Sequence, residues 1–164
     1  MMPRTSFKVL FVCLGNICRS PAGENILRHL VKDAGLENVV EIDSAGTHDY
    51  HPGKAPDHRM TQILATRGIT NHGYGRQFVA DDLSNFDLIL VMDSENLENI
   101  RTLDSEKRHI PKVKRMTDFC VEIAHQIPDV PDPYYGGAEG FEFVADLITD
   151  GCRGVLKHIQ SISQ

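Results

Sequence analysis

The sequence has few cysteines, and none has the spacing of a zinc site or of a CxxC motif. Four cysteines occur in 164 residues, no CxxC pair is present, and no Cys/His cluster has metal-ligand spacing. A chain this long with so few cysteines does not depend on a disulfide framework. These absences argue against a zinc module and against a small disulfide-stabilised domain.

A net positive charge and a long apolar run are also missing. The formal net charge is −6, whereas a nucleic-acid-binding domain is usually basic. No apolar run approaches the ~20 residues of a membrane span. The run at residues 9–14 is short and lacks the cleavage site of a signal peptide. We therefore expect a soluble, cytoplasmic protein with neither a nucleic-acid nor a membrane partner.

Instead, the chain alternates between short apolar runs, which are typical of strands, and segments whose apolar residues have helical spacing. Buried strands are expected at residues 7–13, 39–44, 86–92 and 109–114. Helices are expected at residues 21–34, with Ser20 as N-cap, and at about 57–67, 94–103, 117–126 and 142–162. Asp57 and Asp93 are expected to cap the second and third of these helices by accepting backbone N–H groups. Strands that alternate with helices indicate a parallel sheet. The sequence thus predicts one α/β domain over residues 1–164, a three-layer sandwich with a four-stranded parallel sheet and helices on both faces.

The segment after the first strand has the composition of an anion-binding loop. It reads Cys13-Leu14-Gly15-Asn16-Ile17-Cys18-Arg19-Ser20 and leads into a helix. Gly15 and Asn16 tolerate the left-handed turns that point backbone N–H groups inward, and a helix N-terminus attracts anions. Arg19 adds a planar fork for two phosphate oxygens. The same field would stabilise a Cys13 thiolate, the nucleophilic form, and Ser20 could hydrogen-bond its sulfur.

A second candidate segment, Asp132-Pro133-Tyr134-Tyr135-Gly136-Gly137, lies near the last helix. Breaking a phosphate ester needs a proton donor for the departing oxygen, and Asp132 could supply that proton. The two tyrosines could flank a flat substrate ring. On composition alone, however, the segment is equally typical of a turn.

Together, CLGNICRSP near the N-terminus and DPYYGG near the C-terminus resemble the low-molecular-weight protein tyrosine phosphatase family. Shorter matches occur along essentially the whole chain. They are DSAGT at residues 43–47, APD at 55–57, Arg76-Gln77, and VMD at 91–93. The resemblance implies hydrolysis of a phosphotyrosine-containing protein or a small aryl phosphate, with phosphate as product and no metal or organic cofactor.

The resemblance also implies roles for single residues. Cys13 would attack phosphorus, Arg19 would bind the phosphoryl oxygens, and Asp132 would be general acid and then base. Asn16 and Ser20 would order the loop and support the thiolate. Cys18 would form a disulfide with Cys13 on oxidation. The implied substrate-binding set is Leu14, Gly15, Asn16, Ile17, Cys18, Ser20, Tyr50 and Tyr134.

Some features depart from the family pattern. The first helix opens Pro21-Ala22-Gly23, where the family usually has a larger residue before alanine. Gly23 should lower helix stability by about 1 kcal/mol. His72 is displaced by one residue from a family histidine, so no loop-supporting role is assigned to it. Residues 117–127 form a longer connection than usual before Asp132, which could change how the acid is held.

Other functions on similar chains remain open. Arsenate reductases with a similar loop relay a disulfide through later, closely spaced cysteines, whereas this chain has none between Cys18 and Cys120. A phosphate-binding module without activity would not need Cys13, Arg19 and Asp132 together. Protein arginine phosphatases carry threonine where this chain has Ile17, and an apolar side chain there favours a phenyl ring.

Overall fold

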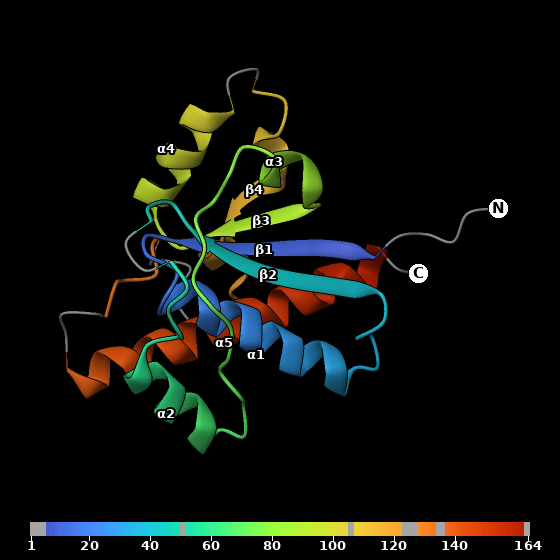
Figure 1. The fold of residues 1–164 in the computed structure, drawn as a ribbon. Helices are drawn as coiled ribbons and strands as arrows, with labels where there is room; N and C mark the ends of the chain where they lie inside the picture. The colour runs from blue at the N-terminus through green and yellow to red at the C-terminus, as the bar shows by residue number, and fades with distance from the viewer. Residues whose placement is uncertain (1–5, 50–51, 105–106, 123–127, 134–136, 163–164) are drawn as a thin grey trace.

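The computed structural model describes residues 6–49, 52–104, 107–122, 128–133 and 137–162. Its centre is a sheet of four parallel strands in the order β2-β1-β3-β4 (Figure 1). The strands are β1 (Phe7–Cys13), β2 (Val40–Gly46), β3 (Leu88–Val91) and β4 (Val113–Arg115). The four-stranded parallel sheet predicted from the sequence is therefore confirmed.

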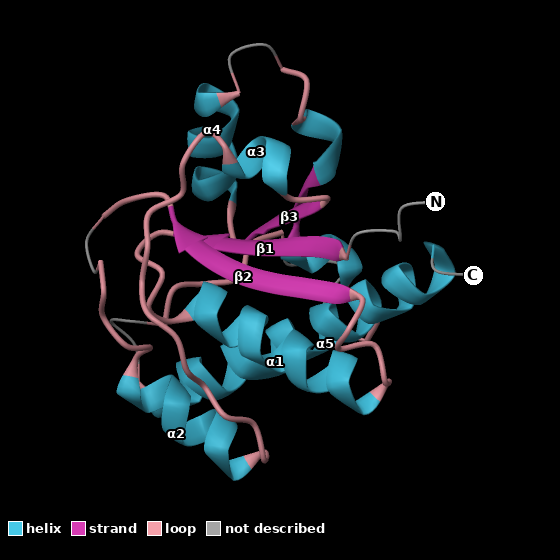
Figure 2. Ribbon diagram, turned by 45° about the vertical axis from the view of Figure 1, so that its right-hand side comes forward, coloured by secondary structure: helices cyan, strands magenta, loops and turns pink. Residues whose placement is uncertain are grey.

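Helices cover both faces of this sheet, which confirms the predicted three layers (Figure 2). One face is covered by α1 (Arg19–Asp33) and α5 (Ala138–Ile162), and α2 (His58–Thr66) packs against α5. The other face carries α3 (Asp82–Asn85) and α4 (Ser94–Leu103). Among the described helices, none combines the length and apolar character needed to cross a bilayer.

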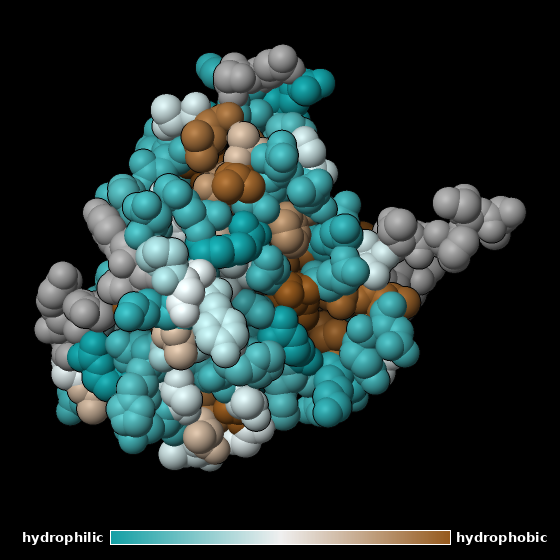
Figure 3. Space-filling view, viewed as in Figure 1, coloured by the Kyte–Doolittle hydropathy of each residue, from teal (hydrophilic) through white to brown (hydrophobic). Residues whose placement is uncertain are grey.

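Strand β1 forms part of the cores on both sides of the sheet. Its alternate residues Val9 and Phe11 face the cluster formed with α1 and α5, whereas Leu10 and Val12 face the cluster beneath α3 and α4. All four side chains are fully buried. On the face shown in Figure 3 the surface is mainly hydrophilic, with hydrophobic residues confined to a few places.

The connections place a crevice at the carboxyl end of β1. From β1 the chain passes through α1 to β2 on one side, and later returns to β3 on the other side. Ligands of open parallel sheets bind at such a switch point, because neighbouring loops diverge there. The loop at residues 14–18 lies at this point.

The first helix begins earlier than predicted. It starts at Arg19, Cys18 occupies the N-cap position, and Ser20 lies inside the first turn. The prediction of Ser20 as N-cap was wrong, because its hydroxyl contacts the Cys13 sulfur instead. The caps predicted at Asp57 and Asp93 are confirmed, since each carboxylate accepts N–H groups of the helix that follows.

The predicted helix at residues 117–126 was also wrong over its described part. Only a short 3-10 turn, η2 (Met116–Phe119), forms there. The buried Asp150 carboxylate accepts the N–H groups of Val121 and Glu122, so these donors are satisfied outside a helix. The fourth strand forms, but it begins later than predicted: residues Ile110–Lys112 are a 3-10 turn, η1, with a proline in its first turn, and β4 follows at Val113–Arg115.

Gly23 lies where α1 passes close to Phe11 of β1. A Cβ atom at this position would lie 2.5 Å from the ring atom Cδ1 of Phe11, which is fully buried. The sequence predicted only a loss of helix stability here. The structure adds a reason for glycine, which is the close approach of the helix to the sheet.

We expect Gly23→Ala to lower the free energy of unfolding by about 1–3 kcal/mol, because the added methyl group overpacks the Phe11 ring. Helix propensity alone would raise stability by about 1 kcal/mol. Gly140→Ala in α5 is a matched control, since the nearest atom to its Cβ would be Pro133 Cβ at 3.9 Å. Urea unfolding measures both. A Gly23→Ala protein as stable as Gly140→Ala would contradict the packing argument.

Candidate active site

The loop between β1 and α1 is held in a tight curve against the end of β2. Asn16 has a φ of 57°, the left-handed conformation that asparagine tolerates. At Gly46, a Cβ atom would lie 2.9 Å from the carbonyl oxygen of Leu14, so glycine permits the close approach. The N–H groups of Thr47 and His48 donate to the carbonyls of Cys13 and Leu14, at 2.9 and 3.0 Å.

Cys13 lies at the base of this curve and is 3% exposed. Its Sγ is 3.0 Å from Ser20 Oγ. Asn16 Nδ2 donates to the same Ser20 oxygen at 2.8 Å, so the hydroxyl hydrogen is left for Cys13 Sγ or for the Ala45 carbonyl, 3.4 Å away. Because Sγ is the nearer of the two, the arrangement suits a thiolate that accepts a hydrogen bond.

Arg19 brings a buried positive charge to the same place. Its side chain is 3% exposed, and Nη1 donates to Asp93 Oδ2 at 2.7 Å and to the Val130 carbonyl at 3.0 Å. Burial by itself lowers the pKa of this guanidinium. The negative charges of Cys13 and Asp93 outweigh burial, so the pKa of Arg19 lies above its ordinary value. Arg19 therefore stays charged.

Asp132 lies across the crevice, with Oδ2 3.7 Å from Arg19 Nη2 and its side chain 40% exposed. The segment that carries it is anchored by Val130, whose N–H donates to the Met92 carbonyl at 2.7 Å. Thr117 Oγ1 donates to the carbonyl of Pro128 at 2.7 Å. The long connection before Asp132 is thus fixed at this point.

Asp129 is engaged at the beginning of α4. Its Oδ1 accepts both the N–H and the hydroxyl of Ser94, each at 3.0 Å. Two acidic residues of the same segment therefore have different surroundings. Asp129 stabilises a helix N-terminus, whereas Asp132 faces the Arg19 guanidinium.

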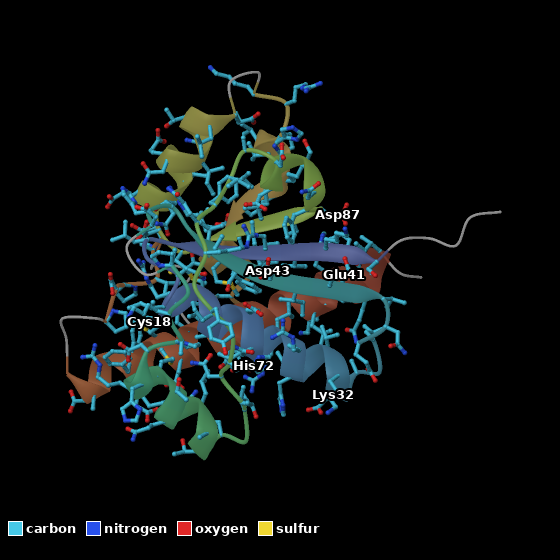
Figure 4. The ribbon with its side chains drawn as sticks, viewed as in Figure 1. Cys18, Lys32, Glu41, Asp43, His72 and Asp87 are labelled. Carbon is cyan, nitrogen blue, oxygen red and sulfur yellow. The ribbon has the colours of Figure 1, made fainter. Side chains whose placement is uncertain are left out.

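Cys18 is also buried, at the start of α1 (Figure 4). Burial and then the nearby Cys13 raise its pKa far above the ordinary value, so this sulfur remains a thiol. Both cysteines are free in the structure, and their disulfide stays a prediction. Cys152 is a buried residue of α5, and Cys120 is buried against the same helix, where its Sγ donates to the Leu147 carbonyl. Burial raises the pKa of Cys120 to about 12, in keeping with packing roles.

The other predicted site residues divide into two groups. Leu14, Gly15 and Ile17 are half-buried in the loop, and the Ile17 carbonyl accepts the N–H of Asp57 at 2.6 Å, which joins the loop to α2. Tyr50 and Tyr134 lie outside the described residues. Within the described ranges, no group of three or more His, Cys, Asp or Glu residues could hold a metal ion.

Sequence reasoning missed two residues that shape the site. Asp93 was recognised as a helix cap, but its pairing with Arg19, 74 positions away, was not predicted. Arg76 was noted only within a matching dipeptide, yet its N–H donates to Asn16 Oδ1 at 2.9 Å. Neither contact leaves a signal in local sequence spacing.

Comparison with known proteins places this geometry among phosphatases. Residues 8–164 match the family model described as low molecular weight phosphotyrosine protein phosphatase. A relative from Synechocystis, named as a low molecular weight protein-tyrosine-phosphatase, is 49% identical over 91% of this chain and 94% of its own length.

Two solved structures illustrate the range of similar folds. A protein tyrosine phosphatase from Entamoeba histolytica is 38% identical with a TM-score of 0.91, covering 97% of this chain and all of its own. An arginine phosphatase from Drosophila is 32% identical with a TM-score of 0.85, over 93% of this chain and 98% of its own.

The two oxygens of Asp93 have separate tasks, which substitutions can separate. Oδ1 accepts the Asn96 N–H at 2.8 Å as the cap of α4, while Oδ2 binds Arg19. We expect Asp93→Ala to lower the free energy of unfolding by about 2–4 kcal/mol, because it removes a cap and leaves Arg19 without its closest carboxylate. Asp93→Ser should recover only about 1 kcal/mol, since serine restores the cap alone.

Urea unfolding of the two Asp93 variants measures this difference. If Asp93→Ser were as stable as the unmodified protein, the ion pair with Arg19 would contribute nothing to folding.

Proposed function

The chain belongs to the low molecular weight phosphotyrosine protein phosphatase family, and we propose that it hydrolyses phosphotyrosine in proteins through a cysteinyl-phosphate intermediate. The observation that carries the proposal is the convergence of a buried cysteine, a buried arginine and an aspartate. Cys13 and Arg19 share one loop, and Asp132 lies 3.7 Å from the Arg19 guanidinium.

In the first step, the Cys13 thiolate attacks phosphorus and the ester bond to the tyrosine oxygen breaks. The Ser20 hydroxyl lies 3.0 Å from the sulfur and can donate a hydrogen bond to the attacking atom. The guanidinium of Arg19 and the N–H groups at the start of α1 hold the phosphoryl oxygens, whose charge spreads as the bonds change. The Asp93 carboxylate fixes the orientation of the Arg19 guanidinium, so that it can bind these oxygens.

The leaving phenolate takes a proton from Asp132, which enters this step protonated. In the second step a water molecule attacks the phosphocysteine and gives a proton to Asp132. The phosphorus–sulfur bond breaks, the Cys13 thiolate is restored, and inorganic phosphate departs. Arg19 neutralises the developing charge in both steps.

The entrance to the loop favours an aromatic substrate. Leu14 and Ile17 are half-buried at the crevice and offer apolar contact to a phenyl ring. By resemblance, Tyr50 and Tyr134 would complete the walls that hold the ring. Dephosphorylation of phosphoarginine is the competing activity, since an arginine phosphatase has a similar fold. The polar guanidinium of phosphoarginine, however, suits contact with the apolar Ile17 less well than a phenyl ring does.

Arsenate reduction is less well supported. That reaction would need thiols to relay a disulfide away from Cys13, whereas Cys152 is a buried residue of α5 and Cys120 is buried against that helix. We place the enzyme in the cytoplasm, because its nucleophile must stay reduced and all four cysteines are free.

We expect Cys13→Ser to lose all measurable turnover and still bind vanadate or phosphate, because Arg19 and the loop N–H groups remain. A turnover panel of phosphotyrosine, phosphoserine and phosphoarginine peptides, with arsenate separately, tests the substrate class in the unmodified enzyme. Faster turnover of phosphoarginine than of phosphotyrosine would assign the competing activity, and near-normal turnover by Cys13→Ser would refute the mechanism.

We expect Asp132→Asn to slow phosphotyrosine hydrolysis by about 10²–10⁴-fold, the usual contribution of a general acid. An aryl phosphate with a leaving group of low pKa should be affected far less, because its anion departs without a proton. Single-turnover rates for a series of aryl phosphates measure the difference. Asp129→Asn is the control, since its carboxylate binds Ser94 and should show no dependence on the leaving group. Equal losses for all esters would make Asp132 a structural residue.

A further inference from the structure

Arg76 is held by two carboxylates from different elements. Its Nε donates to Asp43 Oδ2 on β2 at 3.1 Å. Nη1 and Nη2 donate to the two oxygens of Asp82 on α3, at 3.0 and 3.1 Å. Asp82 is buried and also accepts the Val79 N–H at 2.9 Å, and Asp43 is labelled in Figure 4. We name Arg76, Asp43 and Asp82 the arginine clamp.

Arg76 keeps its charge at every relevant pH. Burial by itself lowers the pKa of Arg76, but the hydrogen bonds and charges of Asp82 and Asp43 outweigh it, and the pKa lies above its ordinary value. The planar guanidinium binds carboxylate oxygens through several N–H groups at once, which fixes the orientation of the Arg76 side chain as well as its position.

The clamp fixes the backbone of the residue that carries it. The Arg76 carbonyl accepts the Gly46 N–H at 2.9 Å, and Phe78 N–H returns to the Gly46 carbonyl at 2.7 Å. Residues 76–78 therefore extend the sheet beside the end of β2, where Gly46 bridges Gln77. Because these hydrogen bonds fix the backbone at Arg76, its N–H keeps one direction and donates to Asn16 Oδ1.

That N–H determines which way the Asn16 amide faces. With Oδ1 bound to Arg76, Nδ2 is directed at Ser20 Oγ, 2.8 Å away. The serine oxygen accepts this bond, so its own hydrogen is free for the Cys13 sulfur. A flipped Asn16 amide would present an oxygen to Ser20 and attract that hydrogen away from sulfur.

We propose that Arg76 is a positioning residue for the nucleophile, which acts through its backbone N–H, Asn16 and Ser20 to direct a hydrogen bond at Cys13 Sγ. The inference rests on the proposed function, in which that sulfur is the attacking atom. It assigns the clamp a task in the reaction, although neither Asp43 nor Asp82 touches the loop sulfur in the described contacts.

Direct electrostatics around Cys13 come from other groups. Cys18 and Arg19 interact with its charge, and Asp57 and Asp132 act on Cys18 as well. Asp93 acts on Arg19. These groups remain in place when the clamp is changed, so a change in the reactivity of Cys13 would reach it through the hydrogen-bond relay.

The test is the pH dependence of Cys13 alkylation by iodoacetate, measured together with phosphotyrosine turnover. We expect Arg76→Ala to raise the pH at which alkylation is half-maximal, the alkylation midpoint, by about 0.5–1 pH unit. A shift of this size corresponds to the partial loss of a hydrogen bond to a charged atom. The kcat for phosphotyrosine should fall by about 3–10-fold, the same loss expressed as a rate, with a smaller change in KM. Arg67→Ala is the matched control, because Arg67 also binds two carboxylates, Glu142 and Asp146, between α2 and α5. It should leave the midpoint unchanged.

A second clamp variant separates the relay from simple charge. Loss of a positive charge in Arg76→Ala and loss of a negative charge in Asp82→Asn would move the midpoint in opposite directions if charge alone acted. The relay predicts an upward move in both. If Arg76→Ala does not fold, Asp43→Asn replaces it, since that carboxylate is about half exposed and binds the same guanidinium.

Combination with Ser20→Ala completes the test. In a Ser20→Ala protein, Arg76→Ala should cause no further midpoint shift, because the last donor of the relay is gone. Opposite shifts in the two clamp variants, an equal shift in Arg67→Ala, or full additivity with Ser20→Ala would each overturn the proposal. The unmodified enzyme's turnover panel decides the proposed function separately, since alkylation of Cys13 requires no substrate.

Discussion

The buried charge of Arg19 is the constraint on which the active-site architecture depends. A guanidinium that is 3% exposed must find partners inside the protein, because burying an unpaired charge is costly. Its partners come from separate parts of the chain: Asp93 after β3, and Val130 and Asp132 in the segment before α5. Satisfying one charge therefore draws the phosphate loop, the start of α4 and the acid segment to a single point.

Those features of the fold that follow from local pattern could be predicted from the sequence. The apolar run at residues 7–13 is typical of a buried strand, and it forms the strand β1. The caps Asp57 and Asp93 were visible because a capping residue acts on N–H groups two or three positions away. The phosphate loop was visible for the same reason, since its nucleophile, turn residues and arginine are contiguous.

Features that depend on distant partners could not be predicted. Serine before proline is typical of a helix N-cap, but the Ser20 hydroxyl contacts the Cys13 sulfur instead of capping the helix. Residues 121–122 have helical composition, yet Asp150 accepts their N–H groups from another helix. Gly23 looked like a defect until the Phe11 ring was placed beside it. In each case a tertiary contact prevailed over a local preference.

The bond from Arg19 to the Val130 carbonyl has a consequence for the order of events during synthesis. The two residues are 111 positions apart, and Arg19 and Asp93 are 74 apart. Contacts of such sequence separation form late in folding, because closing a long loop costs conformational entropy. A nascent chain therefore presents Arg19 long before the carboxylate and the carbonyl that hold it, which follow 74 and 111 positions later. The active site can assemble around this charge only after the segment at Val130 has left the ribosome.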